Sequence, residues 1–196
     1  KIRTLELLSV LDMLCLVILI VIQTLAAMKM SVLNKLLEQR AYTDAHTGLP
    51  NKDACEVLLN NKETVAKHTA CMMFDLNNLK IINDTKGHSK GDQLILNFAR
   101  LLRNVIPQKD FVGRYGGDEF MVVIYNTSKT EIEDILKQLS REKDRLNSSG
   151  NNMPIDYACG WAISDADSEC TIQMLLDKAD YYMYENKQAY KKSKKS

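Results

Sequence analysis

No two cysteines in this sequence form a CxxC pair, and the total of five is odd. Their wide spacing argues against a disulfide framework and against a structural zinc site. Two of the three histidines, His46 and His68, also lack metal-ligand spacing, and His88 follows a turn glycine. Cys71 and Cys159 lie in apolar, strand-like runs, where cysteine is usually a small core residue. These patterns favour a reducing, cytosolic setting for the main domain.

The sequence also lacks an excess of either charge, with 26 Lys and Arg residues against 25 Asp and Glu residues. Domains that bind nucleic acid usually carry a basic excess, so we expect no nucleic-acid partner. No internal repeat is present, and low complexity is confined to the KKSKKS end, of which residues 193–196 are interpreted as a basic tail. The charged fraction and the long apolar segments are typical of a folded chain.

One long hydrophobic run stands near the N-terminus, where the segment from Met13 to Met28 contains no charged residue. As a helix this run would span about 24 Å, which is shorter than a hydrocarbon layer of about 30 Å. Extension back to Leu5 supplies the length but includes Glu6 and Asp12. We interpret residues 1–40 as a membrane-spanning or membrane-anchored signalling helix. A soluble dimer helix and a signal peptide are the alternatives.

A turn marked by Gly48 and Pro50 separates this helix from a region of alternating helices and strands. Two of the strands are short and flank a Gly-Gly turn, which is a hairpin signal. Apolar periodicity predicts helices over 53–68, 90–106, 130–146 and 171–188, and strands over 69–75, 111–115, 119–125 and 154–163. This order predicts an α+β fold with one largely antiparallel sheet and helices packed on it.

The hairpin turn places two acids, Asp118 and Glu119, directly after the glycines Gly116 and Gly117. Glycines at a turn let the backbone adopt positive φ and let a bulky group approach closely. Consecutive strand residues point to opposite faces, so only some of these groups can face one ligand. Taken alone, such a sequence is more often a tight turn with polar decoration than a site.

A second polar cluster follows the strand that ends at Asp75, a position where open sheets commonly place ligand-binding groups. Asn83 and Asp92 could read a base, because an amide offers both donor and acceptor and a carboxylate accepts from ring N–H and amino groups. Lys80 could contact a phosphate. The alternatives are turn and capping preferences for the first two, and a solvated charge for the lysine.

Taken together, these elements resemble the GGDEF family of diguanylate cyclases in order and spacing, through RYGGDEF, FDLNNLKIIND…GH…GD and DAHTGLPN. The resemblance covers about residues 41–192, which would form the catalytic domain. It implies an α+β fold related to adenylyl cyclase catalytic domains and to the polymerase palm, with an antiparallel-rich sheet flanked by helices. It also implies an enzyme that condenses two GTP molecules into cyclic di-GMP and releases two pyrophosphates.

The resemblance implies that two Mg²⁺ ions are held by Asp75, Glu119 and Asp118, with help from the backbone carbonyl of Leu76. Oxygen ligands of this kind are what Mg²⁺ prefers. Asp118 and Glu119 would be the catalytic residues, and Asp118 would also help to deprotonate the attacking 3′-hydroxyl. The two metals would stabilise the attacking and leaving oxygens of an in-line displacement at the α-phosphate.

For the substrate, the resemblance implies that Asn83 and Asp92 read the guanine of GTP. The phosphates would be contacted by Lys80, Lys187 and Lys191 and would lie against the bare backbone of Gly116 and Gly117. One domain holds one GTP, so the reaction implies a homodimer. We expect the protein at the inner, cytoplasmic membrane with its catalytic domain in the cytoplasm.

Several positions depart from the family pattern. His46 and Lys52 stand where Leu and Arg are usual, and Tyr190 and Lys191 stand where Gly and Arg are usual. Lysine keeps the charge but lacks the bidentate fork of arginine, so we expect weaker triphosphate binding. Pro107 replaces the arginine of an RxxD product-inhibition site. The alternative function is a degenerate GGDEF domain that binds GTP or a dinucleotide as a regulatory module. A purely structural, membrane-tethered dimerisation domain would leave the two acid clusters unexplained.

Overall fold

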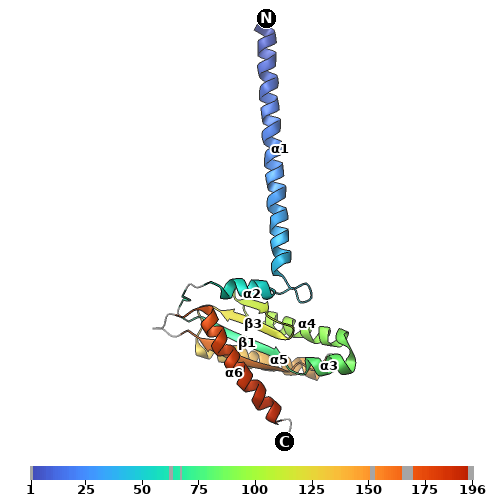
Figure 1. Ribbon diagram of the computed structural model, residues 1–196, viewed down its shortest axis with the longest axis vertical. Coiled ribbons are helices and arrows are strands. Elements are labelled where there is room, and N and C mark those ends of the chain that lie inside the picture. Colours follow the sequence, from blue (N-terminus) through green and yellow to red (C-terminus); the bar gives the residue numbers. More distant parts are fainter. Residues whose placement is uncertain (1, 62–63, 67, 151–152, 165–169, 194–196) are drawn as a thin grey trace. The chain divides into compact units, whose positions relative to one another are not determined.

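A computed structural model describes the chain except for residues 1, 62–63, 67, 151–152, 165–169 and 194–196, and it divides into two compact units, Lys1–Ala41 and Tyr42–Ser196. The first unit consists of helix α1, Ile2–Tyr42 (Figure 1). The side chains from Met13 to Arg40 are exposed. The segment Met13–Tyr42 is long and apolar enough to cross a membrane. Signal sequences have a similar length and composition.

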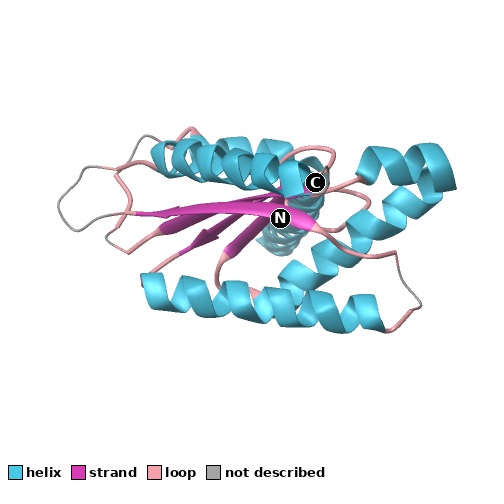
Figure 2. Ribbon diagram, turned by 90° about the horizontal axis from the view of Figure 1, so that it is seen from below, coloured by secondary structure: helices cyan, strands magenta, loops and turns pink. Residues whose placement is uncertain are grey.

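The second unit is built on a four-stranded sheet in the order β2-β3-β1-β4, with every neighbouring pair antiparallel. The strands are β1 Ala70–Leu76, β2 Phe111–Arg114, β3 Glu119–Ile124 and β4 Tyr157–Ile163. The helices are α2 Lys52–Leu59, α3 Leu79–Lys86, α4 His88–Val105, α5 Lys129–Ser148 and α6 Ile172–Ser193. Helices lie on both sides of the sheet (Figure 2). The α+β architecture predicted from the sequence is therefore confirmed.

Two hydrophobic clusters fill the space between the sheet and its helices. Alternate residues of β1, such as Met72 and Phe74, pack with α4 and α5 on one face. The intervening residues, Cys71 and Met73, pack with α2 and α6 on the other face. Every residue of β1 is buried, as expected for a central strand that is covered on both faces. Its last residues, Asp75 and Leu76, therefore remain buried at the edge of the sheet.

Close packing of α6 on β4 depends on Gly160. A Cβ atom at this position would overlap the carbonyl oxygen of Ala179 and the amide nitrogen of Met183, and would lie 2.7 Å from the carbonyl carbon of Tyr182. All three atoms belong to the backbone of α6. The absence of a side chain at Gly160 therefore sets how closely this helix approaches the sheet.

The main differences from the elements predicted by periodicity concern α2, α3, β4 and α6, which ends at Ser193 rather than at residue 188. The helix expected over 53–68 is wrong in its second half, because α2 ends at Leu59 and Asn60 forms its C-cap. Helix α3 was not predicted; it starts after Asn78, which has a positive φ of 62° and makes no side-chain capping bond. The strand expected from residue 154 begins only at Tyr157.

Candidate functional site

The hairpin acids and the end of β1 meet at one edge of the sheet. Asp75 lies directly opposite Glu119 in the antiparallel register of β1 and β3, so their side chains share a face of the sheet. The amide of Leu76 donates to the carbonyl of Asp118 over 2.9 Å, which joins the hairpin turn to the end of β1. The structure thus brings together the four positions expected to hold metal.

Lys187, from α6, completes this group. Its Nζ lies 2.6 Å from Oδ2 of Asp75, which is only 5% exposed. The other carboxylate oxygen of Asp75 is buried and has no hydrogen-bond partner among the described residues. The lysine expected to contact phosphate is therefore paired here with the acid expected to bind metal.

Burial and neighbouring negative charges raise the pKa of both hairpin acids, Asp118 and Glu119. Burial raises the pKa of Asp118, and the charge of Asp75 raises it further, against smaller effects of Lys187 and Arg114. Burial also raises the pKa of Glu119, and its acidic neighbours add to the shift. Both shifts reflect partly buried carboxylates that repel one another.

The residues fit a hard, oxygen-binding cation, although within the described ranges no three acids, histidines or cysteines are arranged as a preformed metal site. The donors are carboxylates, including the unpartnered oxygen of Asp75, and carboxylates are the ligands that Mg²⁺ prefers. A bound cation would also remove the repulsion that raises the pKa values of Asp118 and Glu119.

We expect Glu119→Gln to raise the melting temperature of the metal-free protein at neutral pH. The folded-state pKa of Glu119 lies above its ordinary value of 4.5, so the folded chain binds this proton more tightly than the unfolded chain. Stability is therefore lost as pH rises through 4.5 and stays lost above the raised value. The variant removes this loss, and its advantage should shrink at a pH of about 4.

Thermal melts in EDTA and in Mg²⁺ would measure this effect. Glu185→Gln, which changes an exposed glutamate on α6, is the matched control and should leave both melts unchanged. Mg²⁺ should stabilise the wild type more than Glu119→Gln. A metal-free wild type that melts above the variant would contradict the prediction.

Asn83 and Asp92 lie on neighbouring helices, α3 and α4, and are brought together at Gly91. A Cβ atom at Gly91 would overlap Oδ1 of Asn83 and lie 2.8 Å from its Cγ. The carboxamide of Asn83 therefore lies against the first turns of α4, one residue from Asp92. The two residues expected to read the guanine are thus close in the fold, and their role stays a prediction.

Gly91→Ala is expected to weaken binding of 3′-deoxy-GTP about tenfold without lowering stability, since it displaces a hydrogen-bonding side chain rather than backbone. Alanine in place of a helical glycine would by itself favour α4 by about 1 kcal/mol. Isothermal titration and thermal melts would separate the two effects. Asn83→Ala should weaken binding to a similar degree, and the double variant should lose little more. Additive losses would show that Gly91 acts elsewhere.

The lysines expected to contact phosphate line two adjoining cavities. One, of about 480 Å³, is lined by Asp75, Glu119, Lys187 and Lys191. The other, of about 240 Å³, is lined by Leu76, Asp118, Lys80 and the same two α6 lysines. Five further residues of α6 line the larger cavity, and none was among the site residues predicted from the sequence: Asp177, Asp180, Tyr181, Met183 and Tyr184.

The hairpin glycines differ in their surroundings. A Cβ atom at Gly116 would lie 2.6 Å from Oε2 of Glu119, so the acid folds back over this residue. Nothing lies within 4 Å of the corresponding position at Gly117. Only the second glycine therefore leaves open space beside the backbone, as a bound phosphate would need.

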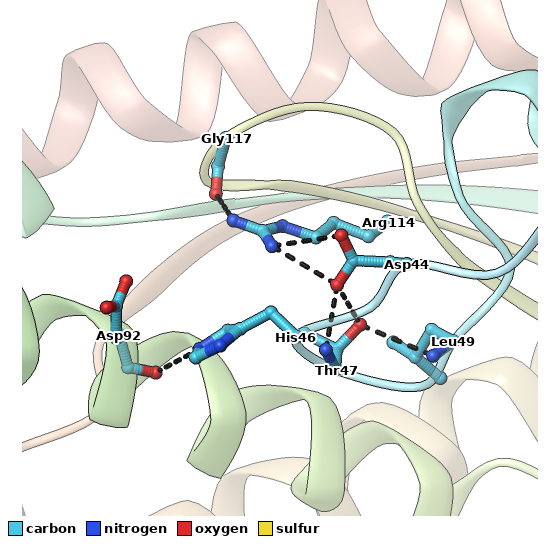
Figure 3. A network of polar contacts seen from close by, with 7 residues as sticks. All are labelled: Asp44, His46, Thr47, Leu49, Asp92, Arg114 and Gly117. Atoms are coloured by element: carbon cyan, nitrogen blue, oxygen red, sulfur yellow. Dashed lines mark hydrogen bonds and ion pairs between the residues drawn. The ribbon is translucent and has the colours of Figure 1, made fainter.

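The turn after α1 is bonded to the hairpin (Figure 3). The carboxylate of Asp44 accepts bonds of 3.2 Å from Nη1 of Arg114, and Nη2 of Arg114 donates to the carbonyl of Gly117 over 2.9 Å. Burial would raise the pKa of Asp44, but hydrogen bonds from Thr47 and the charge of Arg114 together lower it. The ion pair thus holds the hairpin against the turn.

The same turn reaches α4. Nε2 of His46 lies 3.0 Å from the backbone oxygen of Asp92 (Figure 3). The DAHTGLPN segment was recognised as part of a family pattern, but neither Asp44 nor His46 was assigned a role from the sequence. Both act through contacts with residues far along the chain, which local patterns do not reveal.

Asp110, the last residue of the product-inhibition element 107–110, is buried. Its Oδ1 accepts from the amide of Tyr125 over 3.1 Å, which fixes it to the end of β3. The neighbouring cavity, of about 570 Å³, is lined by Pro107, Gln108 and Arg103 among others. Pro107 supplies no charge there, so we predict no feedback inhibition through this element.

Comparison with known proteins finds a family match and curated relatives. The family described as "Diguanylate cyclase, GGDEF domain" matches residues 41–193. Diguanylate cyclase DgcP of Escherichia coli is 30% identical over 165 residues, covering 82% of this chain and 48% of its own length. Signaling protein YkoW of Bacillus subtilis is 31% identical, covering 80% and 20%. Cyclic di-GMP phosphodiesterase PdeB of Shewanella oneidensis is 32% identical, covering 74% and 17%. The chain thus spans half or less of each of these relatives.

Solved structures share the fold. The GGDEF domain of DgcB from Caulobacter crescentus, in complex with c-di-GMP, superposes with a TM-score of 0.65 at 25% identity, covering 76% of this chain and 89% of that one. The coiled coil and GGDEF domain of the same protein gives a TM-score of 0.73 at 22% identity, covering 85% and 91%. The match to the second structure shows the fold alone.

Proposed function

The chain belongs to the GGDEF family of diguanylate cyclases, and we propose from this that it condenses two GTP molecules into cyclic di-GMP with release of two pyrophosphates. The observation that carries the proposal is the complete set of acids at one edge of the sheet. Asp75 lies opposite Glu119, beside Asp118, next to cavities lined by Lys187 and Lys191.

Each domain would bind one GTP, with Asn83 and Asp92 at the guanine. Lys80, Lys187 and Lys191 would contact the phosphates, and the open space beside Gly117 would admit them. The 3′-oxygen of one GTP would attack the α-phosphorus of the other. A new P–O bond forms, and the bond to the β-phosphate oxygen breaks to release pyrophosphate. A second such step closes the ring.

Asp118 is the proposed proton acceptor. A carboxylate at this position could accept the proton of the attacking 3′-hydroxyl as a general base. Mg²⁺ held by Asp75, Glu119, Asp118 and the carbonyl of Leu76 would supply positive charge to the attacking and leaving oxygens. Lys187, which compensates Asp75 in this structure, would then be available to the triphosphate.

We propose that catalysis takes place in a homodimer, since the two GTP molecules must be presented by two domains. We also propose that α1 anchors the chain in the cytoplasmic membrane, with the catalytic domain in the cytoplasm where GTP is found. The length and hydropathy of Met13–Tyr42 support this anchor. The balanced charge of the chain gives no reason to propose a nucleic-acid partner.

A regulatory module that binds GTP without turnover is the second candidate. It is favoured by Tyr190 and Lys191, which depart from the family pattern, and by relatives named as phosphodiesterases. Incubation of the purified full chain with GTP and Mg²⁺, followed by chromatography and a pyrophosphate assay, tests the two candidates. Cyclic di-GMP that disappears in Glu119→Gln supports the cyclase. Binding of GTP without pyrophosphate release supports the module.

A further inference from the structure

The turn that carries His46 is held closed by its own backbone. The amide of Asp44 donates to the carbonyl of Leu49 over 2.7 Å, and the amide of Gly48 donates back to the carbonyl of Asp44 over 2.8 Å. The hydroxyl and amide of Thr47 both donate to the Asp44 carboxylate, over 2.6 and 2.8 Å. These bonds fix the backbone of the turn, and with it the Cα position of His46.

His46 extends from this turn to the first turns of α4. Its Nε2 lies 3.0 Å from the backbone oxygen of Asp92, and a carbonyl oxygen can only accept a hydrogen bond. Nε2 must therefore carry the proton in this contact. The bond fixes the backbone of the residue whose carboxylate is exposed at the site and which follows Gly91, the contact point of Asn83.

We infer that His46 is a positioning residue for Asp92 and thereby sets how strongly the site prefers guanine. The inference rests on the proposed function, in which Asp92 accepts hydrogen bonds from the base. The family pattern has leucine at this position, and leucine can fill space but cannot donate to a carbonyl. This chain therefore has a hydrogen bond between the turn and α4 that an apolar residue would not provide.

The turn that carries His46 also contacts the hairpin. Asp44, two residues before His46, holds Arg114 and through it the carbonyl of Gly117. One rigid turn therefore positions both the hairpin, at the phosphate end of the site, and α4, at the base end (Figure 3). Loss of the His46 bond should free α4 near Asp92 but leave the hairpin in place. The Asp44–Arg114 pair, which holds the hairpin, does not involve the imidazole.

Binding of two nucleotides that differ in the base tests the inference. The probes are 3′-deoxy-GTP and 3′-deoxy-ITP, which lack the attacking hydroxyl, and ITP also lacks the amino group that a carboxylate would accept from. With the full chain in detergent and Mg²⁺, we expect His46→Ala and His46→Leu to reduce the GTP-over-ITP preference about three- to tenfold, the range of one hydrogen bond. His46→Gln should keep part of it through its amide donor.

The matched control is His68→Asn, which removes another exposed histidine, located before β1 and at a positive φ of 65° that asparagine tolerates. It should leave the preference unchanged. An unchanged preference in His46→Ala, even with weaker binding of both nucleotides, would show that His46 only stabilises the turn and would overturn the inference. A glutamine variant as unselective as the alanine variant would also overturn it.

The result is independent of turnover. A wild-type chain that binds 3′-deoxy-GTP selectively but forms no cyclic di-GMP would contradict the proposed function and leave the role of His46 intact. A wild type without any preference for the guanine nucleotide would overturn the inference, whether or not the chain makes product.

Discussion

Asp75→Asn is expected to reduce formation of cyclic di-GMP by more than about a hundredfold, since even changes outside the inner ligands of a metal cost up to that much. Asp75 is 5% exposed, lies opposite Glu119 and has one oxygen on Lys187 and one without a described partner. Replacement of Asp75 by a neutral amide would remove one of the cation ligands that we propose.

The fold should survive this change. Removal of one partner of a buried ion pair costs about 3–5 kcal/mol when the other charge is left buried. The side chain of Lys187 is 25% exposed, so its ammonium can turn to solvent, and the asparagine oxygen can still accept from it. Thermal melts and circular dichroism would check stability beside the product assay. Asp134→Asn, an exposed residue of α5, is the control that should keep activity. Turnover by Asp75→Asn close to that of the control would contradict the role of Asp75.

Gly160→Ala is expected to lower the free energy of unfolding by about 3 kcal/mol, at the upper end of the usual cost of overpacking. The new methyl group would overlap backbone atoms of Ala179 and Met183, which cannot rotate away as a side chain can. Helix α6 would have to lift from β4 and would carry Lys187 and Lys191 with it. Both stability and nucleotide binding should therefore fall.

Urea denaturation monitored by circular dichroism would measure the loss of stability. The informative comparison is Gly117→Ala, because nothing lies within 4 Å of a Cβ atom there. Gly117→Ala should unfold at the wild-type urea concentration and yet bind 3′-deoxy-GTP less tightly, since the methyl group would occupy the proposed phosphate space. An unchanged unfolding midpoint for Gly160→Ala would mean that α6 is not held by this contact.

The parts of the fold that the sequence predicts well are those with strong periodicity. Strand β1 is an apolar run, and α4 carries its apolar residues on one face, so both were identified to within two residues. The second half of the predicted helix over 53–68 was wrong for a tertiary reason. Val65 continues the apolar pattern, but its amide donates to the carbonyl of Cys170 over 2.8 Å, a distant contact that no local pattern contains.

Helix α3 was missed for a local reason. It spans only eight residues and starts after Asn78, a residue with left-handed backbone geometry and no side-chain cap. The usual signal for a helix start is therefore absent, and the Asn83–Asp84 pair within it favours turns. A short helix of this kind is stabilised by its packing against α4 rather than by its own sequence.

The acids and lysines of the candidate site could be identified from the family pattern. The ion pairs and hydrogen bonds that they form in the structure could not be predicted from it. The ion pair of Lys187 with Asp75 joins residues 112 positions apart, and the contact of His46 with Asp92 depends on how the turn packs on α4. Sequence order gives the residue types that metal, base and phosphate require. The partners that these residues have without ligand follow only from the tertiary structure.

The ion pair between Lys187 and Asp75 has a consequence for the stability of the domain. A buried carboxylate without compensation would cost several kcal/mol, and a site that relied on its ligands for neutrality would be destabilised each time they left. Lys187 acts as a resident counterion on a partly exposed side chain. We therefore expect the domain to stay folded when the proposed nucleotide and cation are absent.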